Sequence, residues 1–321
     1  MLRWESGWET HGVGGWQVRW LRVQDGERST MVRFVPAMGC NVIGWEVDGV
    51  EYLVASEPDG RILGTPILYP MPNRVRDGVF SFDGREFRFA PNNGPNFIHG
   101  LVRDVLWELD EPQATQDGVS LTARVAIEPG TPLYEIFPIG NTLTLRLQVA
   151  LGRLEMAFTV QNDDAVHRLP FGLAIHPYFA IHGRRSDVTL HVPARRCMEA
   201  ESLLPTGRLL PASACSADPT QPVSLEGLDL DDVFWGMRSD HPATITYTSL
   251  SKRVTLAADD WFTHAVVYTP PEAPYFCVEN QSCSTDAHNL HTRGLTEAAH
   301  LTILEPGQTH RASIVFRLDD V

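Results

Sequence analysis

Two histidines, an arginine and a glutamate stand in distant parts of the chain, each beside residues that restrict the backbone. They occur in the fragments Asn73-Arg74, Ile98-His99-Gly100, His176-Pro177-Tyr178-Phe179 and Val278-Glu279-Asn280-Gln281. Glycine, proline and aromatic neighbours help to fix the direction in which such a side chain points. A carboxylate and imidazoles held in fixed positions can exchange protons with a ligand. These residue types therefore indicate an acid–base site.

His176 ends an apolar run, Leu169 to Ile175, and precedes a proline. Because proline disfavours a helical backbone at the preceding residue, we expect His176 to be extended. Tyr178 can line a pocket and offer its ring face to the C–H groups of a sugar. A histidine in apolar surroundings needs partners for its ring nitrogens. Either a substrate oxygen or a backbone carbonyl can be that partner.

Glu279 follows the apolar segment Tyr275 to Val278, at the expected end of a strand. A carboxylate in such a place is unfavourable unless it is ion-paired, hydrogen-bonded or functional. Partial burial would raise its pKa above the ordinary value of about 4.3 and make it a better base. A structural ion pair with an arginine is the alternative.

Further candidates for ligand binding lie around residues 73 to 99. Arg74 carries a planar fork of donors that suits a carboxylate or two neighbouring hydroxyls, and Asn73 adds a donor and an acceptor. His99 follows a polar, turn-rich loop, where a histidine can face a cleft. Taken singly, Arg74 can instead cap nearby carbonyls, and His99 can be an ordinary half-buried histidine. Asp231 is another candidate, although a solvated turn explains it equally well.

The elements that must position these side chains are predicted to be strands. Alternating apolar and polar residues indicate strands at Met31–Val35, Val79–Phe89, Ser120–Ile127, Leu143–Leu151 and Ala312–Leu318. Val47-Asp48-Gly49 and Phe82-Asp83-Gly84 are typical of hairpin turns. No helical periodicity is sustained, and the 23 prolines disfavour long helices. We therefore expect an all-β fold, a large antiparallel β-sandwich, with residues 1–321 in a single domain.

Composition excludes several classes of function. The net charge of -14 opposes binding to nucleic acid, and no basic stripe offsets it. No apolar run approaches the roughly 20 residues that span a membrane. The segment Met1 to Trp8 lacks the apolar centre of a secretory signal, so we expect a cytoplasmic protein. Lys252 is the only lysine and has an arginine beside it, which disfavours Schiff-base chemistry.

Two further expectations concern the cysteines and one loop. The cysteines show no C-x-x-C spacing, and we expect buried free thiols at Cys40, Cys197, Cys215, Cys277 and Cys283. The stretch from Leu204 to Ser224 is rich in proline, serine and alanine and predicts a long surface loop.

Taken together and in this order, the fragments resemble the aldose 1-epimerase (galactose mutarotase) family. The resemblance extends over about residues 15 to 318, nearly the whole chain. The matching residues are Asn73-Arg74, Asp83-Gly84, Ile98-His99-Gly100, His176-Pro177-Tyr178-Phe179, Asp231, Phe234, Glu279-Asn280-Gln281, Asp286-Ala287, Asn289 and Pro306-Gly307.

The resemblance implies a supersandwich with a shallow sugar cleft on one sheet. It implies that Glu279 is the general base, that His176 is the general acid, and that His99 binds near the ring oxygen and the anomeric centre. Arg74, Asn73 and Asp231 would then hold the other hydroxyls. No metal or organic cofactor is expected. The implied activity is that of an aldose 1-epimerase acting on a free aldohexose, as a monomer or a homodimer with no membrane or nucleic-acid partner.

One position departs from the family pattern. In relatives a polar residue that touches the sugar often precedes the aromatic residue of the strand before the glutamate. Here the segment Ala265-Val266-Val267-Tyr268 is apolar, unless His264 substitutes. The preferred sugar therefore stays open.

Three alternatives remain at the level of the sequence. Two histidines and a glutamate can form a metal-binding facial triad, although no compact ligand spacing supports one. The same scaffold can bind a sugar without catalysis. A mutarotase for hexose 6-phosphates would need a local arginine cluster, for which Arg74 with Arg76, or Arg103, are candidates.

Overall fold

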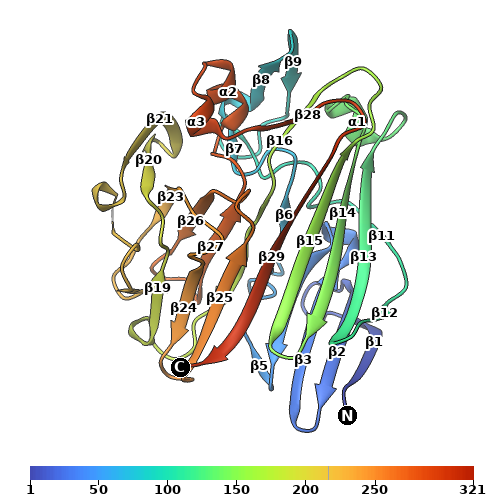
Figure 1. Cartoon of the computed structure of the whole chain (residues 1–321), viewed down its shortest axis with the longest axis vertical. Helices are drawn as coiled ribbons and strands as arrows, with labels where there is room; N and C mark the ends of the chain where they lie inside the picture. Colours follow the sequence, from blue (N-terminus) through green and yellow to red (C-terminus); the bar gives the residue numbers. More distant parts are fainter. Residues whose placement is uncertain (216) are drawn as a thin grey trace.

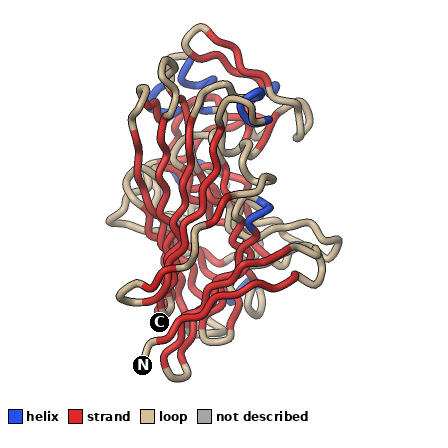
Figure 2. Tube along the Cα trace, turned by 90° about the vertical axis from the view of Figure 1, so that its right-hand side faces the viewer, coloured by secondary structure: helices blue, strands red, loops and turns tan. Residues whose placement is uncertain are grey.

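Two layers of antiparallel sheet pack face to face in the computed structural model, which describes residues 1–215 and 217–321 (Figure 1). A 10-stranded sheet forms one layer, and a 5-stranded and an 8-stranded sheet form the other. All strand pairs within these sheets are antiparallel. The view in Figure 2 shows the layers from the side, with both chain termini at the same end. The prediction of a large all-β sandwich is confirmed.

The 10-stranded sheet has the order β11-β13-β14-β15-β29-β25-β24-β19-β22, with β12 beside β13. Its strands are β11 (Glu108–Leu109), β12 (Gln113–Ala114), β13 (Gly118–Ile127), β14 (Asn141–Ala150), β15 (Arg153–Asn162), β19 (Val188–His191), β22 (Val223–Ser224), β24 (Ala243–Tyr247), β25 (Lys252–Ala258) and β29 (Thr309–Asp320).

The other layer carries the strands that matter most for function. The 5-stranded sheet runs in chain order through β1 (Arg3–Thr10), β2 (Gln17–Asp25), β3 (Arg28–Val35), β4 (Asn41–Val47) and β5 (Val50–Glu51). The 8-stranded sheet has the order β21-β20-β23-β26-β27-β17-β6, with β18 beside β27. Its strands are β6 (Ile67–Leu68), β17 (Ala174–Ile175), β18 (Tyr178–Ala180), β20 (Arg196–Glu201), β21 (Leu204–Pro211), β23 (Asp231–Trp235), β26 (His264–Tyr268) and β27 (Tyr275–Gln281).

The remaining elements are short. Three two-stranded pairs join β7 (Arg74–Val75) to β10 (Phe97–Ile98), β8 (Val79–Phe82) to β9 (Arg85–Arg88), and β16 (Leu169–Phe171) to β28 (Thr302–Leu304). The helices are α1 (Pro132–Ile136), α2 (Ala287–Thr292), α3 (Thr296–Ala299) and the 3-10 turns η1 (Pro36–Met38), η2 (Arg76–Gly78), η3 (Arg185–Asp187) and η4 (Ala212–Ala214). Within the described residues, no helix is long and apolar enough to span a membrane.

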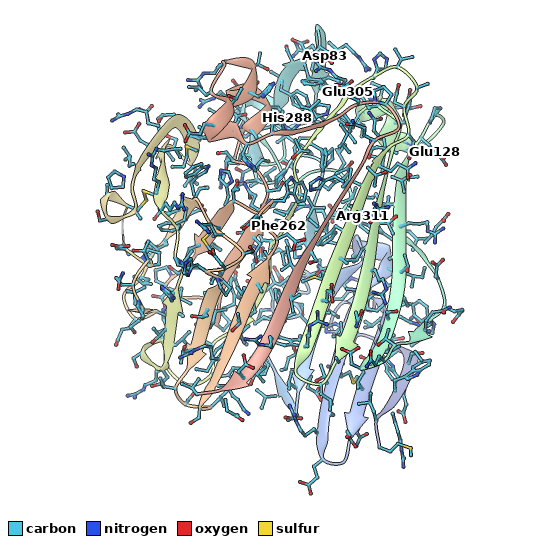
Figure 3. All side chains as sticks on the ribbon, in the orientation of Figure 1. Asp83, Glu128, Phe262, His288, Glu305 and Arg311 are labelled. Atoms are coloured by element: carbon cyan, nitrogen blue, oxygen red, sulfur yellow. A yellow bond between two sulfur atoms is a disulfide. The ribbon has the colours of Figure 1, made fainter. Side chains whose placement is uncertain are left out.

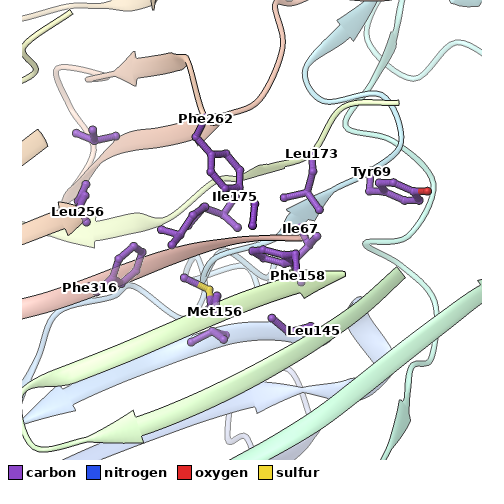
Figure 4. Packing of buried hydrophobic residues seen from close by; sticks show 14 of the residues in the cluster. Ile67, Tyr69, Leu145, Met156, Phe158, Leu173, Ile175, Leu256, Phe262 and Phe316 are labelled. Atoms are coloured by element: carbon purple, nitrogen blue, oxygen red, sulfur yellow. The ribbon is translucent and has the colours of Figure 1, made fainter. Parts of the chain in front are cut away.

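The core lies between the layers because alternate residues of each strand point inward. In β14, for example, Leu143, Leu145 and Leu147 are all fully buried. Figure 4 shows Met156 and Phe158 of the larger sheet among residues of the other layer. The main apolar cluster includes residues from Leu21 to Phe316 and so draws on nearly the whole chain. This continuity supports the proposal of a single domain.

The local predictions for strands and turns agree with the structure. Each predicted segment falls on a strand or hairpin, at β3, β8–β9, β13, β14 and β29. Asp48-Gly49 and Asp83-Gly84 adopt positive φ angles, as the tight turns of hairpins require.

The expectation of a loop from Leu204 to Ser224 is wrong over its first part. Leu204–Pro211 is β21, which pairs with β20 at the edge of the 8-stranded sheet. Prolines are tolerated in edge strands because one side of the strand needs no hydrogen-bond donors. Residue 216, in the predicted loop, lies outside the described residues.

The expectation of free thiols holds for three cysteines and is wrong for two. Cys40, Cys277 and Cys283 are buried and free. Cys197 and Cys215 form a disulfide, with their Cα atoms 6.4 Å apart. The β20–β21 hairpin brings them together although they are separated by 18 positions in the sequence, so no spacing motif could reveal the pair.

Candidate active site

All of the site residues predicted from the sequence line one pocket of about 280 Å³ on the 8-stranded sheet. Strands β23, β27 and β18, which lie close together in this sheet, contribute Asp231, Glu279 and Tyr178, and the segment around β7 and β10 contributes the residues numbered 73, 74 and 99. The predicted residues in the lining are Asn73, Arg74, His99, His176, Tyr178, Asp231 and Glu279.

Glu279 and His176 form a buried pair at the centre of this pocket. Glu279 lies on β27, between β26 and β17, and its side chain is 2% exposed. His176 lies between β17 and β18, and its backbone N–H donates to the carbonyl of Pro66. The His176 Nε2 and Glu279 Oε1 atoms are 3.1 Å apart, which is within hydrogen-bond distance.

Burial determines where the proton of this pair resides. It raises the pKa of the Glu279 carboxyl well above its ordinary value, and the nearby Asp231 carboxyl adds to the shift. Burial also lowers the pKa of His176 to about 4. Both shifts favour the uncharged form of each group in the free protein.

His99 approaches this pair from the β7–β10 segment. Its backbone has a φ of 74°, in the left-handed region that few side chains adopt, and its N–H donates to the Asn73 carbonyl. The next residue, Gly100, lies so close to Tyr69 that a Cβ atom would be 2.3 Å from the Tyr69 carbonyl oxygen. The rings of His99 and His176 meet edge to face, with centroids 5.3 Å apart. Burial lowers the pKa of His99 well below its ordinary value, so it is neutral.

Arg74 is held in a network of short-range contacts at the wall of the pocket. Its guanidinium donates to Asn73 Oδ1 at 3.1 Å and to Asn93 Oδ1 at 3.1 Å, and lies 3.7 Å from an Asp231 carboxylate oxygen. Asp231 begins β23, and burial raises the pKa of its carboxyl while Arg74 opposes the rise. The network presents several donors and acceptors at fixed positions, as recognition of neighbouring hydroxyls requires.

Tyr178 lines the pocket and also supports His176. The two rings are stacked, with centroids 4.6 Å apart and an angle of 20° between their planes. One face of the Tyr178 ring is therefore used within the protein, so at most the other face can meet a ligand.

Three buried polar atoms of the pocket lack a partner in the described part of the chain. They are Glu279 Oε2, His176 Nδ1 and His99 Nδ1. Because an unpaired buried polar atom is unfavourable, such atoms indicate a place where a ligand completes the hydrogen bonds. The three residues that carry these atoms line the same pocket, which supports a binding site for a polar molecule there.

Sequence reasoning did not assign four residues that line this pocket, Arg61, Asn93, Ile98 and Tyr268, to the site. Asn93 lies in the turn-rich loop before His99, which gave a weak signal. Tyr268 ends the apolar strand β26, and Arg61 lies in a loop with no distinguishing pattern. His264 does not replace the missing polar residue, because it is fully buried and lies outside the lining.

Other titratable groups serve the structure. His288 of α2, labelled in Figure 3, stacks on Phe80 with ring centroids 4.1 Å apart, and its Nε2 lies 3.2 Å from the Pro170 carbonyl. Asp286 accepts hydrogen bonds from the Arg76 backbone and the Asn289 side chain. Among the described residues, no three His, Cys, Asp or Glu side chains converge as metal ligands would. The facial-triad alternative thus has no geometric support there.

A larger hollow of about 490 Å³ lies elsewhere, beside β13 and α1. It contains no histidine, and its carboxylates, Glu108 and Glu128, are exposed. The smaller pocket is therefore the one equipped for proton transfer.

Comparison with known proteins agrees with this geometry. A family model described as aldose 1-epimerase matches residues 22–317. The chain is 25% identical over 248 residues to the uncharacterized protein YihR of Escherichia coli, and the match covers 76% of each chain. It is 29% identical over 184 residues to galactose mutarotase of Sus scrofa, covering 54% of this chain and 49% of that protein. The match thus spans about half the length of the mammalian relative.

A solved structure shows the same fold. A galactose mutarotase-like protein from Clostridium acetobutylicum superposes with a TM-score of 0.86, and the match covers 99% of both chains at 18% identity.

Proposed function

The chain belongs to the aldose 1-epimerase family, and we propose that it interconverts the α and β anomers of a free aldohexose by opening and reclosing the sugar ring. The buried Glu279–His176 pair carries this proposal, since its atoms lie 3.1 Å apart and one polar atom of each side chain awaits a partner. This reaction needs one group that removes a proton and one that supplies it.

Glu279 acts as the general base and His176 as the general acid. Glu279 takes the proton of the anomeric hydroxyl while His176 gives one to the ring oxygen, and the C–O bond between the anomeric carbon and the ring oxygen breaks. Rotation about the C1–C2 bond presents the other face of the aldehyde, and reversed proton transfers close the ring. His99 binds near the ring oxygen, and Asn73, Arg74 and Asp231 hold the other hydroxyls.

A single proton in the pair serves both directions of this reaction. Ring opening begins with ionised Glu279 and protonated His176, and it leaves protonated Glu279 and neutral His176. The second arrangement is the one that burial favours in the free protein. Transfer of one proton across the 3.1 Å contact converts one arrangement into the other, so no proton need be exchanged with solvent.

The charges around the pocket favour an uncharged sugar over a hexose 6-phosphate. Both arginines of the lining already have carboxylate partners, Arg61 with Glu57 at 2.9 Å and Arg74 with Asp231 at 3.7 Å. The other candidates for a phosphate site are also paired, Arg76 with Asp286 and Arg103 with Asp104. A phosphate dianion would have to compete with these carboxylates.

Polarimetry of freshly dissolved α-D-glucose and α-D-galactose, with protein that has been treated with a chelator, tests the proposal. We expect a faster approach to an unchanged final rotation. The protein should accelerate the mutarotation of α-D-glucose 6-phosphate less than that of the free sugars. Activity that returns only with added metal would contradict the proposed chemistry, and calorimetric binding of a sugar without any acceleration would indicate a binding protein.

The pH dependence of this activity should show loss on the acid side near pH 4. Below the His176 pKa of about 4 the pair holds two protons, so Glu279 can no longer accept one. Because the pKa of Glu279 is raised, the single remaining proton is kept as pH increases from there, and kcat/KM should form a plateau. Rates at each pH, corrected for the reaction without protein, check this. Loss of activity already at about pH 6.5, the ordinary histidine pKa, would contradict it.

Arg74→Ala should raise KM more than it lowers kcat. The guanidinium binds hydroxyls that do not react, so its contacts are the same in the ground state and the transition state. Arg124→Ala, which removes an arginine paired with Asp110 outside this pocket, is the matched control. Initial rates over a range of sugar concentrations separate the two constants. An unchanged KM with a collapsed kcat would assign Arg74 to the transition state instead.

A further inference from the structure

Strand β1 forms an open edge of the 5-stranded sheet. It pairs with β2 along its whole length, and no strand of the described residues pairs with its other side (Figure 1). A free edge presents unpaired N–H and C=O groups, which proteins often protect with proline or lysine. The sequence of β1, RWESGWET, contains no proline, and its three charged residues, Arg3, Glu5 and Glu9, all lie on one face of the strand.

One face of β1 carries exposed aromatic residues beside the buried apolar residues of β2. Trp4 and Ser6 lie opposite Val23 and Leu21 of β2, which are fully buried. Trp4 is nevertheless 39% exposed and Trp8 is 54% exposed, because β1 is the last strand of the sheet. Large exposed aromatic side chains on one strand face are typical of a contact surface.

The other face of β1 carries unbalanced charge. Glu9 lies 3.4 Å from Arg33, but the same guanidinium also contacts Glu46 at 3.0 Å and Glu51 at 3.3 Å. One cation thus serves three carboxylates. At the opposite end of β1, Arg3 has no ion-pair partner among the described residues.

These features fit a second copy of the same strand. We propose that two copies of this protein associate through β1, antiparallel about a two-fold axis at Ser6, so that their 5-stranded sheets join edge to edge. In this register Arg3 of each copy lies opposite Glu9 of the other, and Trp4 lies opposite Trp8. The unpaired arginine thereby meets the carboxylate that lacks a cation of its own, and the exposed indoles cover one another.

Strand geometry excludes the neighbouring registers. Along β1, the N–H and C=O groups of successive residues point alternately toward β2 and toward the free edge. Two copies of β1 can therefore pair only when residues whose N–H and C=O groups point to the free edge lie opposite each other. The permitted registers therefore differ by steps of two. A register centred on Gly7 places Glu5 opposite Glu9, and one centred on Glu5 places this carboxylate opposite itself. Like charges directly opposite are unfavourable, so the register centred on Ser6 is favoured over both of these, and it pairs more residues of β1 than a register centred on Trp4 or Trp8 would.

Sedimentation velocity of the wild-type protein and its charge variants tests the association. A contact limited to one pair of edge strands falls among the small, weak interfaces, so we expect a dimer in reversible equilibrium with the monomer that becomes more populated as protein concentration rises. Arg3→Glu should weaken it at least about tenfold, since like charges then face each other twice. Adding Glu9→Arg to this variant should restore the dimer, because opposite charges again lie across the interface. Thermal unfolding should show that the single variant, changed at an exposed residue, folds like the wild type.

A cysteine at the axis tests the register. Opposed residues of antiparallel strands have Cα atoms about 4.5–5.5 Å apart, within the range that a disulfide spans, so Ser6→Cys should give a covalent dimer on mild oxidation. Thr10→Cys, on the same face but about 26 Å from its symmetry mate, should not. The three free cysteines of the wild type are buried and should not interfere. Sedimentation as a monomer at every protein concentration tested, or a dimer insensitive to both the charge and the cysteine variants, would overturn the proposal.

Discussion

Replacing Glu279 with glutamine should lower the turnover number at least about 100-fold. Glutamine keeps the shape of the side chain and can still contact His176, but it cannot accept the proton of the anomeric hydroxyl. It also removes the single proton that the pair passes back and forth across 3.1 Å. Polarimetry at saturating sugar measures the change. Turnover near the wild-type value would remove Glu279 from the role of general base.

The matched control is Glu305→Gln, which makes the same chemical change in a carboxylate that is 58% exposed at a turn. Its activity should equal that of the wild type. Stability gives a second readout. The folded-state pKa of Glu279 lies above the unfolded value of about 4.3, so the folded chain binds the extra proton and wild-type stability falls as pH rises from that value. Glu279→Gln lacks this loss, and its melting temperature should exceed the wild-type one increasingly toward high pH.

The layers of the fold could be predicted because strand signals are local. An alternation such as Leu143, Leu145, Leu147 tells which face of a strand is buried without knowledge of its neighbours. Asp48-Gly49 likewise determines a hairpin turn on its own, since only residues that accept a positive φ fit there. Such signals do not reveal which strands pair, and the pairing of β15 with the distant strand β29 within the 10-stranded sheet is seen only in the structure.

Site residues could be predicted where an ionisable side chain occurs in a sequence context that is unusual for it. Glu279 in an apolar strand and His176 before a proline both stand out, and both line the pocket. Arg61 could not be found, because an exposed arginine in a loop is ordinary until the fold brings it beside Tyr178 and Tyr268. The Cys197–Cys215 disulfide was missed for the same reason, since tertiary proximity and not spacing creates it. The family resemblance, which the family model confirms, joined the fragments before any geometry was available.

Replacing His176 with glutamine should also lower the turnover number at least about 100-fold. Glutamine retains hydrogen-bonding capacity but cannot deliver a proton to the ring oxygen, so the leaving oxygen must depart as an anion. The KM should change little, because the hydroxyl-binding groups around Arg74 are untouched. Initial rates measured by polarimetry check both constants. A normal kcat would show that another group supplies the proton, and His99, whose ring centroid lies 5.3 Å from that of His176, is a candidate.

Combining the two substitutions should lower the turnover number little further than either one alone. If Glu279 and His176 were independent catalysts, their losses would multiply to about 10,000-fold or more. In the proposed mechanism they share one proton and act in the same step, so removing either partner already disables that transfer. The double-variant cycle therefore distinguishes a coupled pair from two separate groups that happen to lie 3.1 Å apart. If the loss in turnover number of the double variant equals the product of the two single losses, the shared proton is contradicted. Each residue would still have a catalytic role in that case, but the two would act independently.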